Sequence, residues 1–326
     1  MSFDLLSLFE NVNRVGITGH VRPDGDCVGS TLAMYNYIQK KYPTLDLHIF
    51  LEEIPSCFSF LKNADRIETP GVEQDPFDLF IILDCGDLSR IGKSDLYFHS
   101  AKKTLCIDHH LSNVTFCNEN YVFPEASSTC ELVFDLLVKD DISKDIAECI
   151  YTGIVTDTGL FQYSCTHHST MECAGFLMDL GIDYPVIVDT VFNEKTFVQN
   201  QILGQALINA RLSENKTLVS SILTSQELEK YGAASNDMEG IVSQLRVTKG
   251  AQASLFLHQN PDGSYKGSLR AKGHILNVAE IASHYQGGGH AMAAGFRVNV
   301  DQDPNQVIDD ISRMIDEQLR EGGFFK

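Results

Sequence analysis

The stretch His20-Val-Arg-Pro-Asp24-Gly-Asp26 decides how this chain is interpreted. It follows a short apolar run at residues 15–17 and precedes a helix-like stretch that begins near Cys27. An apolar strand, a polar turn and a helix in this order are typical of an α/β domain. The stretch therefore places one imidazole and two carboxylates at the end of a strand.

The first half of the chain alternates short apolar runs with helical patterns. Four apolar runs predict strands, at residues 14–18, 45–51, 79–83 and 104–107. Helices are predicted at residues 27–40, 127–138, 144–156 and 170–180. Continuous apolar runs of this length suit strands that are buried on both faces, as in parallel sheets. The pattern predicts a doubly wound, mainly parallel α/β sheet.

The second half of the chain has a different pattern, and a length of 326 residues favours two domains. We expect a first domain at residues 1–185, a helical connector at 186–212 and a second domain at 213–326. The second domain is predicted to be a smaller mixed-sheet α/β domain. Its predicted elements are strands at 217–223, 253–258 and 265–270, a Gly-rich turn at 287–290 and a helix at 305–319.

Composition limits the partners of the protein. The net charge of −19 repels long polyanions, so a nucleic-acid substrate is expected to be short and held locally. No apolar run approaches the roughly 18 residues of a membrane span, and the N-terminus lacks a signal-peptide pattern. Nine scattered cysteines without a C-x-x-C pair indicate reduced thiols. We expect a cytoplasmic protein without a membrane partner.

Acidic and imidazole side chains follow three of the predicted strands. In chain order they are His20, Asp24 and Asp26, then Asp84, then Asp108-His109-His110. In open parallel sheets, ligands bind beyond the carboxyl ends of the strands, so these groups are expected to converge. A further acid, Asp157, ends a predicted helix.

So many carboxylates in one place would repel each other unless divalent cations neutralised them. Carboxylate and imidazole ligands without thiolates suit Mn²⁺, with Mg²⁺, Zn²⁺ or Co²⁺ as possible substitutes. The ligands suffice for two ions that share one bridging carboxylate. A single Asp at a strand end is more often a turn or N-cap residue, but the whole combination favours the metal interpretation.

These motifs, taken together, resemble the DHH phosphoesterases with an accessory DHHA1 domain, and the stand-alone NrnA-like enzymes among them. The resemblance extends over nearly the whole chain. It rests on His20-Val-Arg-Pro-Asp24-Gly-Asp26, Leu83-Asp84-Cys-Gly-Asp87, Asp108-His109-His110, Thr152-Gly-Ile-Val-Thr-Asp157-Thr-Gly, Ser268-Leu-Arg270 and Gly287-Gly-Gly-His290. Gln286 stands where the family commonly carries a further glycine.

The resemblance implies two bound Mn²⁺ ions and a role for each motif residue. One ion would be held by His20, Asp24 and Asp84, and the other by Asp26, Asp84, His109 and Asp157. Asp108 would orient a neighbouring imidazole, while His110 would face the scissile phosphate as a phosphate ligand or as an acid. Asp87 would be a helper or a turn residue. Substrate would be bound by Ser268, Arg270, Gly287, Gly288, Gly289 and His290.

The activity implied by the resemblance is hydrolysis of short nucleotide substrates with a water activated between two metals. The expected substrates are short oligoribonucleotides, degraded exonucleolytically, and pAp, which would lose its 3′-phosphate. One alternative is a phosphodiesterase for cyclic or linear dinucleotides, because the same motifs would serve it. A DHH-type pyrophosphatase and a non-catalytic nucleotide sensor are less favoured alternatives. A homodimer is also compatible with the family.

Overall fold

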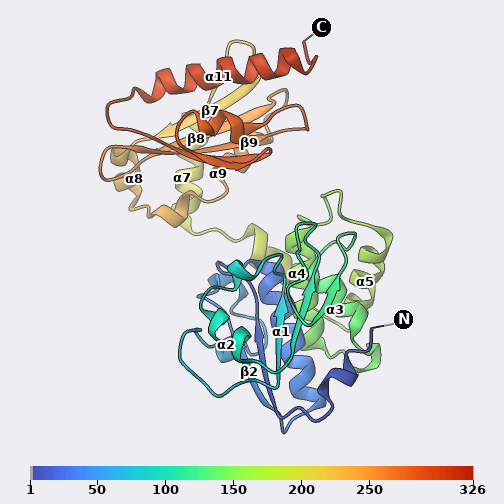
Figure 1. Cartoon of the computed structure of the whole chain (residues 1–326). Coiled ribbons are helices and arrows are strands. Elements are labelled where there is room, and N and C mark those ends of the chain that lie inside the picture. Colours follow the sequence, from blue (N-terminus) through green and yellow to red (C-terminus); the bar gives the residue numbers. More distant parts are fainter. Residues whose placement is uncertain (1–2, 326) are drawn as a thin grey trace. The chain divides into compact units, whose positions relative to one another are not determined.

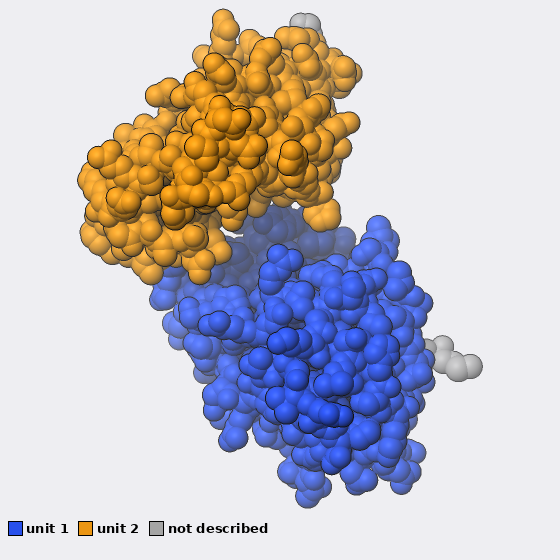
Figure 2. All heavy atoms as spheres, turned by 60° about the vertical axis from the view of Figure 1, so that its left-hand side comes forward, with its two compact units in different colours: residues 1–194 blue, residues 195–326 orange. Residues whose placement is uncertain are grey.

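The computed structural model describes residues 3–325. The chain divides into two compact units, Met1–Glu194 and Lys195–Lys326, which Figure 2 shows in blue and orange. Each unit has its own sheet and its own buried apolar side chains. Among the described residues, no helix has the length and apolar character needed to cross a membrane. The expected ranges of the functional domains and the connector stay predictions.

Unit 1 is built on a five-stranded sheet with the order β2-β1-β3-β4-β5, in which every strand pair is parallel. This confirms the predicted parallel sheet. The strands are β1 (Arg14–Thr18), β2 (Asp46–Phe50), β3 (Leu79–Leu83), β4 (Thr104–Asp108) and β5 (Glu119–Val122). The last strand was not predicted, because its half-buried, polar sequence lies at the sheet edge and lacks an apolar run.

The strand order places the first motif at a reversal of the sheet. From β1 the chain first adds β2 on one side and then adds β3 on the other side. The segments that follow β1 and β3 therefore leave the sheet next to each other, and this is the position at which ligands bind in folds of this kind. His20 follows β1 and Asp84 follows β3, so both lie at this point.

The helices of unit 1 are α1 (Gly25–Lys41), α2 (Asp95–Ser100), α3 (Thr129–Leu136), α4 (Lys144–Asp157), α5 (His168–Asp179) and α6 (Tyr184–Val188) (Figure 1). Of these, α3 and α4 pack closely against α1. A Cβ atom at Gly29 of α1 would lie 2.5 Å from the Cys149 carbonyl oxygen of α4. A Cβ atom at Gly153 of α4 would collide with the Cys130 sulfur of α3. Helices α1, α3 and α4 thus meet at two glycines.

Unit 2 contains a six-stranded mixed sheet with the order β10-β11-β9-β8-β7-β6. Only the β7–β8 pair is parallel. The strands are β6 (Arg211–Leu212), β7 (Leu218–Leu223), β8 (Ala253–Gln259), β9 (Tyr265–Ala271), β10 (Gly288–His290) and β11 (Ala293–Val298). The predicted mixed α/β character of the second domain is confirmed.

Two apolar clusters cover the two faces of this sheet. One contains side chains of α10 (Val278–Ser283) and α11 (Pro304–Glu321), and the other contains side chains of α7 (Phe197–Ile208) and α9 (Ile241–Arg246). A short helix, α8 (Ser225–Tyr231), follows β7. Because α7 buries Ile202 and Ala206 in the second cluster, it packs as part of unit 2.

The Gly-rich segment differs from its prediction. We expected residues 287–290 to form a turn, but Gly288–His290 form strand β10, paired antiparallel with β11. The reason is tertiary: the backbone of Ala293–Gly295 supplies hydrogen-bonding partners that local sequence does not reveal. The chain bends before this strand, at Gln286. Its φ of 55° is in the left-handed region that favours glycine.

The glycine contact between α3 and α4 leads to a stability prediction. Gly153→Ala should lower the free energy of unfolding of unit 1 by about 1–3 kcal/mol, the usual cost of overpacking a core. The added methyl group would meet the Cys130 sulfur and lie 2.8 Å from an Asp26 carboxylate oxygen. Urea denaturation followed by circular dichroism measures this change.

Gly175→Ala is the matched control, because Gly175 lies within α5 and a Cβ atom there would have nothing within 4 Å. This substitution should raise stability by up to about 1 kcal/mol through helix propensity. Equal effects of the two substitutions would contradict the packing argument.

Candidate metal centre and substrate-binding face

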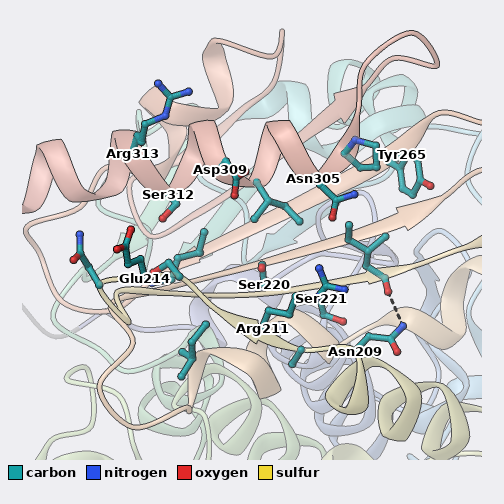
Figure 3. Close-up of a pocket in the computed structure, with 18 of the residues that line it drawn as sticks. Asn209, Arg211, Glu214, Ser220, Ser221, Tyr265, Asn305, Asp309, Ser312 and Arg313 are labelled. Atoms are coloured by element: carbon teal, nitrogen blue, oxygen red, sulfur yellow. Dashed lines mark hydrogen bonds between the residues drawn. The ribbon is translucent and has the colours of Figure 1, made fainter.

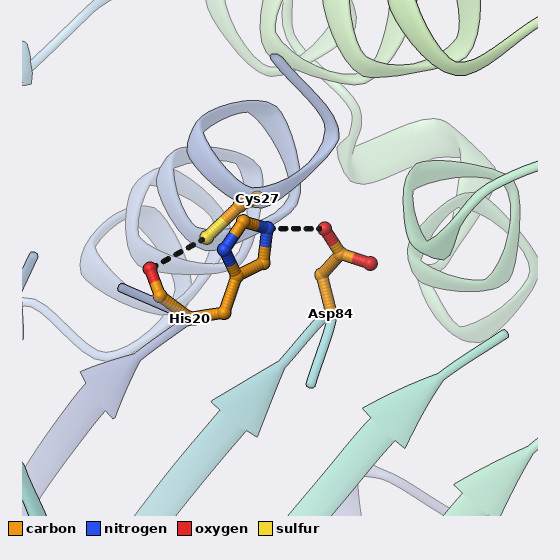
Figure 4. Close-up of side chains that lie close together, drawn as sticks. All are labelled: His20, Cys27 and Asp84. Atoms are coloured by element: carbon orange, nitrogen blue, oxygen red, sulfur yellow. Dashed lines mark hydrogen bonds and ion pairs between the residues drawn. The ribbon is translucent and has the colours of Figure 1, made fainter. Parts of the chain in front are cut away.

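His20 is buried at the end of β1, with one ring nitrogen turned toward carboxylates. Its Nδ1 donates to the Val21 carbonyl at 2.9 Å, which leaves Nε2 3.4 Å from Asp84 Oδ2 and 3.6 Å from Asp24 Oδ1. Figure 4 shows the ring beside the Asp84 carboxylate. Burial lowers the pKa of His20, but the bonds with Asp24 and Asp84 outweigh it and raise the pKa to about 10.

Asp84 lies between two imidazoles in a strained backbone conformation. Its φ of 56° is unusual for a non-glycine residue, and such strain is found mostly at functional sites. One carboxylate oxygen faces His20, while the other lies 3.7 Å from His109 Nε2 and accepts a bond from Thr129 Oγ1 at 3.2 Å. The carboxylate is 2% exposed. Its two oxygens can therefore serve two neighbouring ligand sets.

His109 connects Asp84 to two further carboxylates. Its Nδ1 faces the Ala126 carbonyl at 3.4 Å, and its Nε2 lies 3.3 Å from Asp157 Oδ2 and 3.9 Å from Asp26 Oδ2. Like His20, it thus turns Nε2 toward acids while Nδ1 faces a backbone carbonyl. This orientation is common for histidines that bind metals.

Asp26 and Asp157 complete the second group of ligand-type atoms. The Asp26 carboxylate is buried and accepts backbone N–H groups of Thr129 at 2.7 Å and Cys130 at 2.9 Å, at the start of α3. Burial and the charges of Asp84 and Asp157 raise the pKa of Asp26. Burial, with Asp84 and Asp24, also raises the pKa of Asp157 to about 6. In the absence of a cation, this group of acids is therefore electrostatically strained.

The donor atoms in unit 1 fit divalent cations. Two ligands about 2.1 Å from one ion lie roughly 3.0–3.5 Å apart, close to the spacing between these imidazole and carboxylate atoms. The described residues form three groups whose donor atoms lie within 4.8 Å of one another. These groups are His20, Cys27 and Asp84; Asp84, His109 and His110; and Asp26, His109 and Asp157. Asp84 belongs to two of the three groups.

Cys27 and Asp24 each place a possible metal-ligand atom near His20. Burial and nearby carboxylates raise the pKa of the Cys27 thiol, and its sulfur contacts the His20 carbonyl oxygen at 3.9 Å (Figure 4). A protonated thiol is a poor ligand for Mn²⁺. Asp24 caps α1 by accepting bonds from the backbone of Asp26 and Cys27, and its side chain is 62% exposed. The sequence did not indicate that Cys27 lies here.

His110 belongs to a hydrogen-bonded chain beside the metal-ligand groups. Its Nδ1 donates to Asp108 Oδ1 at 2.7 Å, and Asn113 Nδ2 donates to Asp108 Oδ2 at 2.7 Å and faces the Cys85 carbonyl oxygen at 3.3 Å. The hydrogen bond that His110 donates to Asp108 raises the pKa of His110. Asn113 was missed by sequence reasoning, although its position five residues after Asp108 in the same loop was a usable signal.

Asp87 has a structural role in the described chain. Its side chain accepts a bond from the Ser89 backbone N–H at 2.8 Å and caps the 3₁₀ turn Leu88–Ser94. This contact favours the turn interpretation over the helper interpretation.

The predicted substrate-binding residues of unit 2 lie together on the sheet. Arg270 of β9 is directly opposite Ala293 of β11, which is opposite His290 of β10. The next row on the same face joins Ser268, Gly295 and Gly288 in the same way. Because directly paired residues share a face, Arg270, Ser268 and His290 point to one side of the sheet. It is the side of α7 and α9, since Phe256, opposite Ser268, packs with them.

A pocket of about 1400 Å³ lies in another part of unit 2 (Figure 3). It is lined by the ends of β6 and β7 and by α11, and it contains none of the predicted site residues. Its lining carries both signs of charge, including Arg313, Asp309 and Glu214. Asn209 at its edge donates to the Ile222 carbonyl at 2.9 Å. This pocket therefore does not coincide with the predicted metal ligands or the predicted substrate-binding residues.

Comparisons with known proteins agree with this arrangement. Residues 14–154 match the model of the DHH family N-terminal domain, and residues 214–321 match that of the DHHA1 domain. The bifunctional oligoribonuclease and PAP phosphatase NrnA of Bacillus subtilis is 27% identical over 97% of this chain and 99% of its own length. The cyclic-di-AMP phosphodiesterase PdeA of Listeria monocytogenes is 28% identical over 88% of this chain but only 45% of its own.

One solved structure extends the comparison to the fold. The crystal structure of an exopolyphosphatase-related protein from Bacteroides fragilis superposes with a TM-score of 0.84 at 28% identity. The superposition covers 97% of this chain and 95% of that protein. The two family models together span most of the chain, and the motif residues that carry the resemblance converge at the carboxyl ends of the unit 1 strands. The chain therefore belongs to the DHH family of phosphoesterases and carries a DHHA1 domain in its second half.

Proposed function

We propose that the protein is a Mn²⁺-dependent cytoplasmic phosphohydrolase that removes mononucleotides from short oligoribonucleotides and the 3′-phosphate from pAp. The observation that carries this proposal is the position of Asp84, whose two oxygens face two different imidazoles. The names of the Bacillus subtilis and Thermus thermophilus relatives, both bifunctional oligoribonuclease and PAP phosphatase NrnA, support the substrate class.

The distances within unit 1 support the ligand sets that the family resemblance implies. His20, Asp24 and Asp84 would hold one ion, and Asp26, Asp84, His109 and Asp157 the other, in agreement with their spacing. When bound, such a pair of ions lowers the pKa of a water molecule and neutralises charge that develops on a phosphate. Mg²⁺ or Co²⁺ would be possible substitutes, because the same oxygen and nitrogen donors accept them.

His110 is available for a separate task at the phosphate. Its Nδ1 is engaged by Asp108, so its Nε2 is the nitrogen left to contact a phosphoryl oxygen or to protonate the leaving oxygen. Asp108 stabilises the protonated ring, and Asn113 fixes the orientation of Asp108. The position of the His110 proton thus depends on a chain of two hydrogen bonds.

A phosphodiesterase for cyclic or linear dinucleotides is the second candidate. The similarity to the cyclic-di-AMP phosphodiesterase of Listeria monocytogenes favours it, since that similarity covers 88% of this chain. Both candidates use the same hydrolytic centre and differ in how unit 2 would hold the substrate. We propose Arg270, Ser268, residues 287–289 and His290 for this task, because Arg270, Ser268, Gly288 and His290 share one face and the other two glycines adjoin them in the chain.

A substrate panel separates the two candidates. We expect purified protein with Mn²⁺ to release mononucleotides from a five-residue RNA and a linear dinucleotide, and to produce AMP from pAp. Chromatography of the products measures each rate. Faster hydrolysis of a cyclic dinucleotide than of the linear substrates would favour the second candidate. Hydrolysis of pyrophosphate alone would contradict both.

Asp84→Ala should abolish hydrolysis and reduce the number of bound Mn²⁺ ions, because it removes a donor from both ligand sets. Metal content measured by mass spectrometry and initial rates test this prediction. Asp87→Ala is the control: it removes a carboxylate three residues away that caps a turn and belongs to neither ligand set, so metal content should be unchanged. Wild-type turnover by Asp84→Ala would refute the shared-ligand arrangement.

Asn113→Ala should lower kcat about tenfold while metal content is unchanged, since the residue orients a neighbour rather than binding the ions. Without Asn113 the Asp108 carboxylate is held less firmly against His110, so the pKa of His110, which Asp108 raises in the intact protein, should fall. The alkaline limb of the kcat profile would then move to lower pH. In a His110→Asn background the Asn113 substitution should have little further effect; a full additional loss would show that Asn113 acts independently of His110.

A further inference from the structure

Two half-buried arginines of unit 2, Arg246 and Arg270, form no ion pair with a carboxylate among the described residues. Arg270 is half-buried in β9, and Arg246 is the half-buried last residue of α9. Burial lowers the pKa of Arg270, and the positive charge of Arg246 lowers it further. Among the described residues, the arginines that form ion pairs with carboxylates are Arg14, Arg297 and Arg313.

Strand register and one hydrogen bond place both arginines on the same side of the sheet. Arg270 lies directly opposite Ser254 of β8, and the Ser254 hydroxyl donates to the Val242 carbonyl of α9 at 2.8 Å. Arg246 follows Val242 by four residues, which is about one helical turn on the same side of α9. The contact at Ser254 therefore holds α9 on the face of the sheet that carries Arg270, with Arg246 one helical turn beyond that contact.

The absence of a carboxylate partner for these two arginines within the described structure is unusual in a chain with an excess of acidic residues. The protein has 44 acidic residues and 25 lysines and arginines, so a carboxylate partner would be easy to supply. Like charges that face each other in a partly buried setting raise the energy of the folded protein, and an anion between them removes that cost. Guanidinium groups match the geometry of phosphate oxygens and keep their charge at all physiological pH values. The arrangement thus suits a phosphate ligand.

We propose that Arg246 joins Arg270 in a clamp for a terminal phosphate monoester of the substrate, distinct from the phosphate that is hydrolysed. This inference rests on the proposed function. A monoester phosphate carries nearly two negative charges near neutral pH, whereas a bridging phosphodiester carries one. Two guanidinium groups discriminate between these charges better than one does. Arg246 would therefore set a preference for substrates that end in a 5′-phosphate.

Metal-free binding tests the clamp directly. The full chain in EDTA is titrated with adenosine 5′-monophosphate and with adenosine, and the ratio of the two dissociation constants is measured by calorimetry. We expect wild-type protein to bind the monophosphate more tightly, and Arg246→Ala to reduce the ratio about tenfold, as for loss of a charge-assisted hydrogen bond. Arg246→Lys should retain part of the preference, because it keeps the charge but loses the planar fork.

Lys249→Ala is the matched control. It removes one positive charge at an exposed position three residues after Arg246. At the same ionic strength, this variant should keep the wild-type ratio of the dissociation constants for adenosine and adenosine 5′-monophosphate. A change equal to that of Arg246→Ala would show that only net charge matters, which would overturn the clamp. Thermal unfolding of each variant verifies that α9 remains packed.

A turnover experiment extends the test to selectivity. With Mn²⁺, the ratio of kcat/KM for 5′-phosphorylated over unphosphorylated diadenosine dinucleotide should fall about tenfold in Arg246→Ala. An unchanged ratio, or wild-type protein that binds the monophosphate no better than adenosine, would overturn the inference. The binding arm needs no hydrolysis. Failure of the proposed function would appear separately, as absence of Mn²⁺-dependent turnover by wild-type protein.

Discussion

The burial of the Asp26 carboxylate is the constraint around which unit 1 is arranged. A buried charge is costly unless hydrogen bonds and an opposite charge compensate for it. The start of α3 supplies two N–H groups to this carboxylate, but Asp84 and Asp157 add negative charge instead of cancelling it. Helices α1, α3 and α4 must also approach closely, which only glycine at positions 29 and 153 permits. Helix packing and the electrostatic need for cations are thus consequences of the same arrangement.

Much of unit 1 could be predicted from the sequence because its strands and the polar residues after them are recognisable from short local patterns. Each central strand is a continuous apolar run that ends at a polar residue, and parallel order forces those ends to one edge of the sheet. The convergence of His20, Asp84 and His109 follows from these two facts. The proximity of Cys27 and the support that Asn113 gives to Asp108 could not be predicted, because both depend on how the segments after the strands fold back.

Unit 2 was less predictable because its site depends on strand register. The row Ser254, Arg270, Ala293 and His290 crosses four strands whose pairing no sequence pattern specifies. The glycines at 288 and 289 were interpreted as a turn, since three successive glycines locally favour one. Pairing with β11 converts them into an edge strand and moves the bend to Gln286. No sequence pattern indicates a role for Arg246, because a single arginine in a short helix belongs to no recognisable motif.

Both units of this acidic protein would have to contact an anionic substrate, and their side chains differ in charge: unit 1 presents clustered carboxylates and unit 2 presents arginines. In unit 1 the clustered carboxylates repel a phosphate until cations are bound, so metal loading must precede productive binding there. In unit 2 the proposed positive site consists of arginine side chains, so phosphate binding there would not require a metal ion. If both proposals hold, chelation of the metal should abolish hydrolysis and spare part of the phosphate binding. Because the net charge of −19 repels polyanions, a local positive site of this kind would favour short anionic substrates over long ones.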